Sequence, residues 1–532
     1  MSDMDVEAGL KDVELNEVEV EPEKLPMNSS GGGPGDSNGA LKAKAAEAEQ
    51  PFTGLSKEEL LKVANTPGWV RVRWALLLLF WFGWLAMLAG AIVIIVQAPR
   101  CKALPALRWW QQGTVYQLDV GAFQDSQGDG RGDLAGVQQR LEEIAALKVK
   151  GIVIGPIHQN SPDLINETSL TEIESVYGNM EQFDNLLAAA HRKGIKVILD
   201  LTPNYKGSQE WFGINFNVTD GHQDLLREKE AFQFWLQKGV DGIRLGGIEQ
   251  VLHSVPSRLM EWQNLTRNFS VDEKPRVLIV STVMTNLGEI LQLLNQSDVD
   301  LVFSNYLHRA IAISNLSAAA VQQSVEQYIN GTGKAWPSWA VSGPKIGHMA
   351  TMNANLAGLL PVMLFTLPGT PFIYYGDEIG LQGDMPGQTP WMLWNSSENA
   401  GFTSQLSNRP KPSFNRTVEG QKSDSNSHLS LFKKLSLLKV KERSLQFGEF
   451  RSVYSSGSVY AYLRAWDQSD RFMVLLNFGT EPTTISLRGE DLPAKASVEL
   501  SSLTSRSEEA VELTTVSLGG GEGLVLKFPF VP

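Results

Sequence analysis

The chain has 532 residues, a formal net charge of −13 and 42% hydrophobic residues, enough for a large globular body with polar tails. Its acidic balance does not favour a nucleic-acid backbone as a ligand, so we expect no nucleic-acid partner.

Residues 1–50 are acidic, rich in Gly, Ser and Ala, and almost free of aromatic side chains. Such a segment buries too little apolar surface to offset the entropy lost on ordering, so we predict a disordered tail. In residues 51–73, Ser56 and Glu59 form a capping-box pattern before Leu60. This pattern predicts a short juxtamembrane helix.

An uncharged apolar run of 23 residues extends from Trp74 to Val96. As a helix it would be about 34 Å long, enough for the ~30 Å hydrocarbon core of a bilayer. Arg73 precedes the run, and Trp109 and Trp110 follow it, where we expect amphipathic rings to lie at a membrane interface. The run is too long and too far from the N-terminus for a cleavable signal peptide, so it predicts a single-pass anchor.

Glycosylation sequons indicate the orientation of this anchor. Nine Asn-x-Ser/Thr sequons follow the span and only the one at Asn28 precedes it. Because these acceptors are modified in the secretory lumen, we predict a type II protein with a cytoplasmic N-terminus. The nine candidate sites are Asn166, Asn217, Asn264, Asn268, Asn295, Asn315, Asn330, Asn395 and Asn415.

Cys101 is the only cysteine, and it lies on a predicted extracellular stalk, residues 97–108. An odd cysteine in an oxidising compartment indicates an intermolecular disulfide or a free thiol. The alternative is a buried thiol without a role. We favour a disulfide to another membrane protein, because the stalk lies close to the membrane.

Short apolar strands then alternate with helical stretches such as 136–147 and 183–191, which predicts a parallel (β/α)₈ barrel over residues 109–445. After a helical run at 429–443 the pattern changes to period two, which predicts an antiparallel β-sandwich over 446–532. The eight predicted barrel strands are 114–120, 151–154, 196–201, 242–245, 277–281, 301–304, 338–342 and 371–375.

Several motifs resemble the α-amylase family of glycoside hydrolases, over nearly all of residues 105–532. They are Gly128–Gly136 (GDGRGDLAG), Val197–Leu201 (VILDL), Thr366–Pro371 (TLPGTP) and Tyr375–Gly380 (YGDEIG). The resemblance implies the same barrel and sandwich. Only some forty residues separate Asp200 from Gly242, so the family's domain inserted after the third strand is expected to be absent.

The resemblance also implies where hydrolytic groups would lie. Members use a carboxylate nucleophile and a carboxylic acid at the ends of barrel strands, with a third carboxylate that holds the sugar. At the matching positions this chain has Gly246, Thr282 and Ser342, none of which supplies a carboxyl group. We interpret the nearby acids Asp241, Glu249 and Glu289 as surface charges, and we expect a hydrolase fold without hydrolase chemistry.

An acidic loop offers a candidate metal site. Related hydrolases bind Ca²⁺ in this loop, and alternate side-chain oxygens suit that ion. Gln and Arg depart from the best versions of the pattern, so an ordinary acidic turn is an equal alternative. Any ion would be structural, and no other cofactor is expected. The residues are Asp125, Gln127, Asp129, Arg131 and Asp133.

The region from the membrane segment to the C-terminus resembles the heavy subunits of heteromeric amino-acid transporters, in Phe52–Val63, Pro67–Arg71, Ala98–Cys101 and Asp200–Tyr205. This resemblance implies a non-catalytic glycoprotein at the plasma membrane. It implies a disulfide from Cys101 to a polytopic light subunit that carries the amino acids, and an association with β integrins.

Two other functions stay open at this point. One is a membrane-tethered α-glucosidase with displaced catalytic groups. The other is a glycan-binding adhesion ectodomain that uses the barrel mouth near Tyr205, Trp211 and Arg244.

Overall fold

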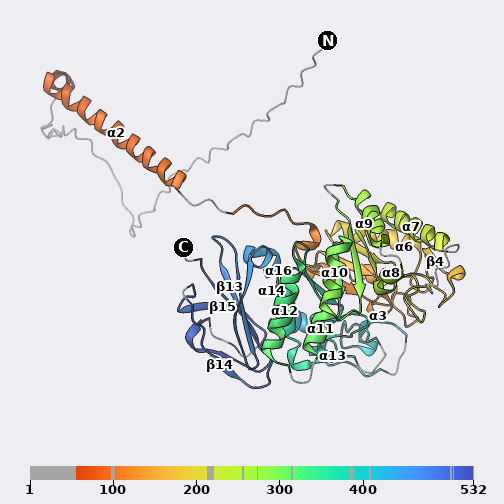
Figure 1. Cartoon of the computed structure of the whole chain (residues 1–532). Coiled ribbons are helices and arrows are strands. Elements are labelled where there is room, and N and C mark those ends of the chain that lie inside the picture. The colour runs from red at the N-terminus through yellow and green to blue at the C-terminus, as the bar shows by residue number, and fades with distance from the viewer. Residues whose placement is uncertain are drawn as a thin grey trace, which may run out of the picture. The chain divides into compact units, whose positions relative to one another are not determined.

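The computed structural model describes residues 56–97, 102–212, 221–254, 257–271, 274–312, 316–383, 389–405, 409–489, 491–503, 506 and 509–530. The chain forms two compact units, Met1–Pro99 and Arg100–Pro532 (Figure 1). The predictions for the tail 1–50, for Cys101, and for the sequons at Asn217 and Asn315 lie outside the described residues.

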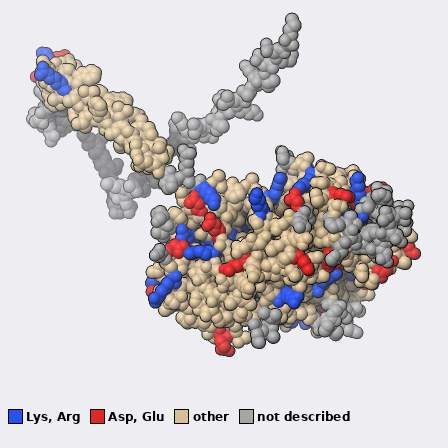
Figure 2. Space-filling model, viewed as in Figure 1, with Lys and Arg blue, Asp and Glu red and all other residues tan. Residues whose placement is uncertain are grey.

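The first unit contains two helices, α1 (Lys57–Ala64) and α2 (Pro67–Gln97). The predicted capping box is confirmed, since Ser56 caps α1 and exchanges hydrogen bonds with Glu59. The 31-residue helix α2 contains the whole predicted span, and it is the one described helix long and apolar enough to cross a membrane. Figure 2 shows charged side chains at one end of this unit and an uncharged surface along the helix.

Eight parallel strands form the barrel of the second unit, in the order β8-β7-β6-β5-β2-β1-β10-β9. Ser338 Oγ on β9 donates to the carbonyl oxygen of Val302 on β8 at 2.6 Å, which links the two ends of the sheet. The eight-stranded prediction is confirmed. The strands are β1 (Val115–Leu118), β2 (Gly151–Ile154), β5 (Lys196–Asp200), β6 (Gly242–Leu245), β7 (Val277–Thr282), β8 (Leu301–Ser304), β9 (Ser338–Trp339) and β10 (Thr370–Tyr374).

Helices cover the outside of the barrel, because one face of each is apolar and packs on the strands. A short hairpin, β3 (His158–Gln159) and β4 (Ser169–Ile173), follows β2. The longer helices are α6 (Met180–Arg192), α7 (Gly221–Lys238), α9 (Ser257–Asn268), α10 (Leu287–Ser297), α12 (Ala318–Thr332), α14 (Leu359–Thr366) and α16 (His428–Lys441). The shorter ones are α3 (Val120–Phe123), α4 (Leu134–Gln139), α5 (Leu141–Ala146), α8 (Ile248–Ser254), α11 (Tyr306–Ile311), α13 (Met349–Met352), α15 (Val418–Lys422) and α17 (Arg443–Gln446).

The helical stretch predicted over 136–147 is present, but it is divided at Arg140 into α4 and α5. The guanidinium of Arg140 donates to Gln124 Oε1 at 2.7 Å and lies 4.3 Å from the centre of the Trp394 ring. These partners are distant in sequence, so periodicity alone does not reveal the break.

The C-terminal part is antiparallel, as predicted. Its main sheet has the order β11-β12-β13-β18-β15-β16, and β14 and β17 form a second, two-stranded sheet. Apolar side chains such as Leu475, Leu526 and Val516 fill the core of this part. The strands are β11 (Glu449–Ser456), β12 (Val459–Ala465), β13 (Arg471–Asn477), β14 (Thr483–Ile485), β15 (Lys495–Ser501), β16 (Ala510–Glu512), β17 (Val516–Leu518) and β18 (Gly523–Phe528).

The interfacial position predicted for Trp109 and Trp110 is wrong. Trp110 is buried in a cluster with the bases of the strands, and Trp109 Nε1 donates to the carbonyl oxygen of Pro275 at 3.0 Å. The end of the stalk also contacts the folded body, since the backbone N–H of Lys102 donates to Asp467 Oδ2 at 2.7 Å. Both rings therefore belong to the barrel and not to a bilayer surface.

Candidate functional site

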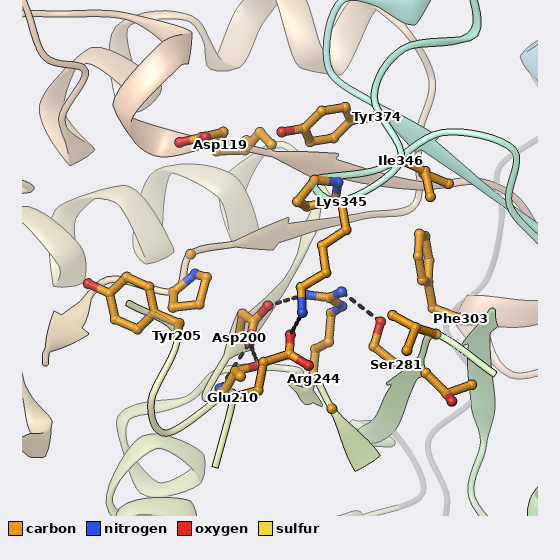
Figure 3. Close-up of a pocket in the computed structure, with 18 of the residues that line it drawn as sticks. Asp119, Asp200, Tyr205, Glu210, Arg244, Ser281, Phe303, Lys345, Ile346 and Tyr374 are labelled. Atoms are coloured by element: carbon orange, nitrogen blue, oxygen red, sulfur yellow. Dashed lines mark hydrogen bonds and ion pairs between the residues drawn. The ribbon is translucent and has the colours of Figure 1, made fainter. Parts of the chain in front are cut away.

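A cavity of about 300 Å³ lies at the mouth of the barrel, where the strands end. In a parallel barrel the carboxyl ends of all strands meet at one face, which is the face that carries active sites in barrel enzymes. Figure 3 shows charged side chains and the ring of Phe303 around this cavity. The residues that matter for its chemistry are Asp119, Asp200, Tyr205, Glu210, Arg244, Ser281, Thr282, Phe303, Lys345 and Tyr374.

Arg244, the third residue of β6, is held by two neighbouring strands. Its Nη1 forms an ion pair with Asp200 at the end of β5, and its Nη2 donates to Ser281 Oγ on β7 at 2.7 Å (Figure 3). Asp200 Oδ1 also accepts from the hydroxyl of Thr202 at 2.6 Å. Both charges are buried, so each side chain holds the other in place and offsets its charge.

A second ion pair joins two loops across the mouth. Lys345 Nζ lies 2.7 Å from Glu210 Oε1 (Figure 3). The Glu210 carboxylate lies against Gly246, where an added Cβ would meet Glu210 Oε1 at 2.8 Å and Thr202 Oγ1 at 2.9 Å. The space beside Gly246 is therefore already occupied by the side chain of another loop.

The other two positions named from the sequence carry hydroxyl groups that are also engaged. Thr282, the last residue of β7, donates to Glu249 Oε2 at 3.0 Å. Ser342 is buried and donates to Asp377 Oδ2, and the same carboxylate accepts from the backbone N–H of Met349 and of Tyr374. Both hydroxyl groups therefore form hydrogen bonds with side chains of the barrel itself.

Asp119 follows β1 and caps α3, where its Oδ1 accepts from the backbone N–H of Gly121 at 2.9 Å. Burial raises the pKa of the Asp119 carboxyl, although hydrogen bonds from Gly121 and Ala122 lower it in part. A raised pKa suits a proton donor. Retaining hydrolysis also needs a free carboxylate about 5 Å away, and the other two described carboxyls that line the cavity, Asp200 and Glu210, are both in ion pairs.

Tyr205 forms part of the wall of the cavity. Its hydroxyl, which has one proton to donate, lies within hydrogen-bonding distance of two acceptors, the carbonyl oxygen of His158 at 3.1 Å and Glu174 Oε2 at 3.0 Å. The imidazole ring of His158 packs edge to face against the Tyr205 ring. Burial lowers the pKa of this imidazole to about 4, so His158 is neutral at physiological pH. Trp211, also named as a possible sugar contact, is buried and donates to the carbonyl oxygen of Gly246.

The acidic loop is folded around its own backbone. Asp125 accepts from the N–H groups of Gln127, Gly128 and Gly130, and Asp133 accepts from Ser126 and Gly136. Asp129 accepts from the N–H of Arg131. In this structure the three aspartates therefore accept hydrogen bonds from the backbone of their own loop. The described residues contain no group of three or more acidic, His or Cys side chains placed to hold a metal ion. Calcium binding stays a prediction.

The described sequons lie on helices and loops of the barrel part. Six asparagines are exposed and Asn395 is half-buried, with its Oδ1 accepting from the Ser397 N–H at 3.0 Å. The exposed ones are Asn166, Asn264, Asn268, Asn295, Asn330 and Asn415.

The interpretation of Asp241 as a surface charge is wrong. Asp241 is buried and accepts from His191, Lys196 and the backbone N–H of Val197. Sequence reasoning also missed Glu210 and Lys345. Glu210 belongs to no recognisable motif, and Lys345 ends the segment matched to the family's third carboxylate. The two residues lie 135 positions apart, so only the folded chain brings them together.

Known proteins resemble this chain at two levels. The family described as "Solute carrier family 3 member 2 N-terminus" matches residues 40–116, and "Alpha amylase, catalytic domain" matches residues 117–224 and 342–448. Among solved structures, Bacillus licheniformis trehalose-6-phosphate hydrolase aligns with a TM-score of 0.65 at 20% identity, covering 80% of this chain and all of that one. Isomaltulose synthase from Klebsiella sp. LX3 gives 0.66 at 19% identity, with 80% and 100% covered. The second unit therefore has the α-amylase fold.

Relatives over the full length are more specific. The mouse amino acid transporter heavy chain SLC3A2 is 45% identical, with 99% of each chain covered. The human amino acid transporter heavy chain SLC3A1 is 28% identical, with 90% of this chain and 86% of that one covered. An α-glucosidase of Culex pipiens is 24% identical, with 79% and 90% covered. The chain belongs to the family of amino acid transporter heavy chains.

Proposed function

We propose that this chain is a non-catalytic heavy subunit that binds a polytopic amino acid transporter light subunit and brings it to the plasma membrane. The observation that carries the proposal is 45% identity, over 99% of both chains, to a protein named as such a heavy chain. The light subunit would carry the amino acids.

The apolar helix α2 supports the proposal that the light subunit, and not this chain, carries the amino acids. One span cannot enclose a polar pathway, because a solute path through a bilayer needs several helices around it. Small residues at Ala86 and Gly90, four positions apart, would let a partner helix approach closely.

The side chains at the barrel mouth support a non-catalytic role. Positions Gly246, Thr282 and Ser342, which the amylase resemblance assigns to the catalytic carboxyls, supply none. Asp200 and Glu210 are neutralised by Arg244 and Lys345.

Cys101 is the proposed attachment point, through a disulfide to the light subunit. The proposed topology is type II, with residues 1–50 as the cytoplasmic tail and residues 97–108 as the extracellular stalk, followed by the barrel (109–445) and the sandwich (446–532). An association with β integrins is carried over from the family resemblance alone.

The test compares the membrane-expressed chain with Cys101→Ser on reducing and non-reducing gels, with the attached protein identified by mass spectrometry. We expect a larger species that collapses on reduction, is absent from the variant and contains a multi-span amino-acid carrier. A chain that runs as a monomer in both lanes, with no carrier co-purifying, would overturn the proposal. Hydrolysis of an aryl α-glucoside by the purified chain would support the glucosidase alternative instead.

A further inference from the structure

A second cavity, a groove of about 630 Å³, lies at the amino-terminal end of the barrel, away from its mouth. Lys196 is the first residue of β5, Asp241 directly precedes β6, and Arg276 directly precedes β7. Because the strands are parallel, these three residues mark the amino-terminal face of the barrel, opposite the mouth. Helix α6 supplies one side of the groove, and α7 contributes Lys238 at its C-terminal end.

Positive charge exceeds negative charge in this groove, although the whole chain is acidic. Its lining contains four side chains with a permanent positive charge and His191, against two carboxylates, Asp184 and Asp241. Asp184 at the rim is paired with Lys238 at 2.7 Å. The four cationic side chains are Lys196, Lys238, Lys274 and Arg276.

Asp241 interacts with three basic side chains. His191 Nε2 lies 2.6 Å, Lys196 Nζ 3.1 Å and Arg276 Nη1 3.6 Å from its oxygens. One carboxylate thus faces three basic groups, while the backbone N–H of Val197 uses part of its accepting capacity. Burial raises the pKa of Asp241, but the hydrogen bonds from His191 and the Val197 N–H and the charge of Lys196 lower it by more, so the pKa lies below its ordinary value.

Two cationic side chains, those of Lys274 and Arg276, have hydrogen-bond donors that are not used within the described parts of the chain. Lys274 is exposed at the edge of the groove, and within the described parts of the chain its ammonium has no ion-pair partner. Arg276 donates through Nη1 to the carbonyl oxygens of Gly239 and Val240, while its buried Nε has no hydrogen-bond partner among the residues the structure describes. Surplus donors of this kind, close to an apolar wall, are suited to an anion.

We propose that this groove binds a soluble organic phosphate or sulfate monoester. The oxyanion would lie between Lys274, Lys196 and Arg276, where ammonium and guanidinium groups make charge-assisted hydrogen bonds to tetrahedral oxyanions. The organic part would lie on the wall formed by Leu187, Ala188 and Ile195, and the groove has the size typical of small-molecule sites.

Phenyl phosphate and phenyl sulfate are suitable probes, titrated calorimetrically into the full-length chain in detergent at constant ionic strength. We expect saturable binding that inorganic phosphate displaces, and none of phenol. Lys274→Gln should weaken binding about tenfold, the effect of losing roughly 1.4 kcal/mol from one charge-assisted hydrogen bond. This variant should fold normally, because Lys274 forms no described ion pair.

Lys229→Gln is the matched control, since Lys229 is exposed on α7 and does not line the groove. It should bind as the unmodified chain does. Absence of saturable binding, or equal weakening by both variants, would overturn the proposal. Binding to phosphatidylserine vesicles without binding of phenyl phosphate would also overturn it, because the anion would then come from a lipid surface. None of these outcomes depends on the transporter role.

Discussion

Lys345 and Glu210 form an ion pair of 2.7 Å across the barrel mouth, and the Glu210 carboxylate lies against Gly246. A loop outside every recognisable motif therefore occupies the space where the amylase resemblance places a nucleophile. The carboxylate of Glu210 occupies the space beside Gly246, and Lys345 offsets its charge.

Restoring a carboxylate at the glycine should therefore not restore catalysis. We expect Gly246→Asp to lower the melting temperature, because its Cβ would meet Thr202 and its charge would face Glu210. Hydrolysis of p-nitrophenyl α-glucoside should stay at background. Adding Glu210→Gln to the same chain should recover part of the lost stability. Turnover by the single variant would contradict this account of the mouth.

The buried pair of Asp200 and Arg244 should be costly to break from one side. Asp200→Asn leaves the guanidinium without its counter-charge, so we expect a loss of about 3–5 kcal/mol in the free energy of unfolding. Urea denaturation followed by tryptophan fluorescence measures it. The double variant Asp200→Leu/Arg244→Met should recover most of the loss, and if it is as unstable as the single variant, the pair is not the cause.

Glu378 should make the fold less stable as the pH rises. Its Oε1 accepts from the Tyr116 hydroxyl at 2.9 Å, and burial raises its pKa to about 8, from an ordinary 4.5. Between these two values the unfolded chain has released the proton that the folded chain retains. Stability contributed by the protonated group is therefore complete below about pH 4.5 and declines toward about pH 8.

Glu378→Gln removes this dependence because an amide does not ionise. We expect its melting temperature to exceed that of the unmodified chain by a margin that grows from about pH 5 to about pH 8. Glu181→Gln, an exposed position in the first turn of α6, is the control and should show no such trend. A margin that is constant with pH would show that Glu378 does not retain its proton.

Glycan mapping should distinguish the described sequons. Removal of N-glycans in ¹⁸O-labelled water, followed by mass spectrometry, should report occupancy at exposed asparagines such as Asn166 and Asn330. Asn395 should have the lowest occupancy, because it is half-buried and its amide lies against Gly401. Detection of no glycan at any sequon after Val96 would contradict the type II orientation.

Local pattern predicted much of the fold. Residues 242–245 and 301–304 were bounded correctly. The second is a short apolar run of the kind that forms a buried parallel strand, and the first, which contains an arginine, is part of a motif that matches the amylase family. The capping box at Ser56 was also correct, because it depends on residues three apart. In the C-terminal part, the sequence did not single out the three-residue strands β14, β16 and β17, which are too short to show a period. It also did not single out the longer strands β11 and β15, in which exposed and buried positions do not alternate regularly.

By itself the sequence determined the apolar span, the alternation of strands and helices, and the absence of carboxyls at Gly246, Thr282 and Ser342. Each of these depends on neighbouring residues or on a motif of fixed spacing. Only the tertiary structure decided that Glu210 occupies the space beside Gly246 and that Asp241 is buried among basic side chains from α6, β5 and the segment before β7. Ion pairing and burial depend on distances in space, and folding brings together charges that lie tens of residues apart in the chain.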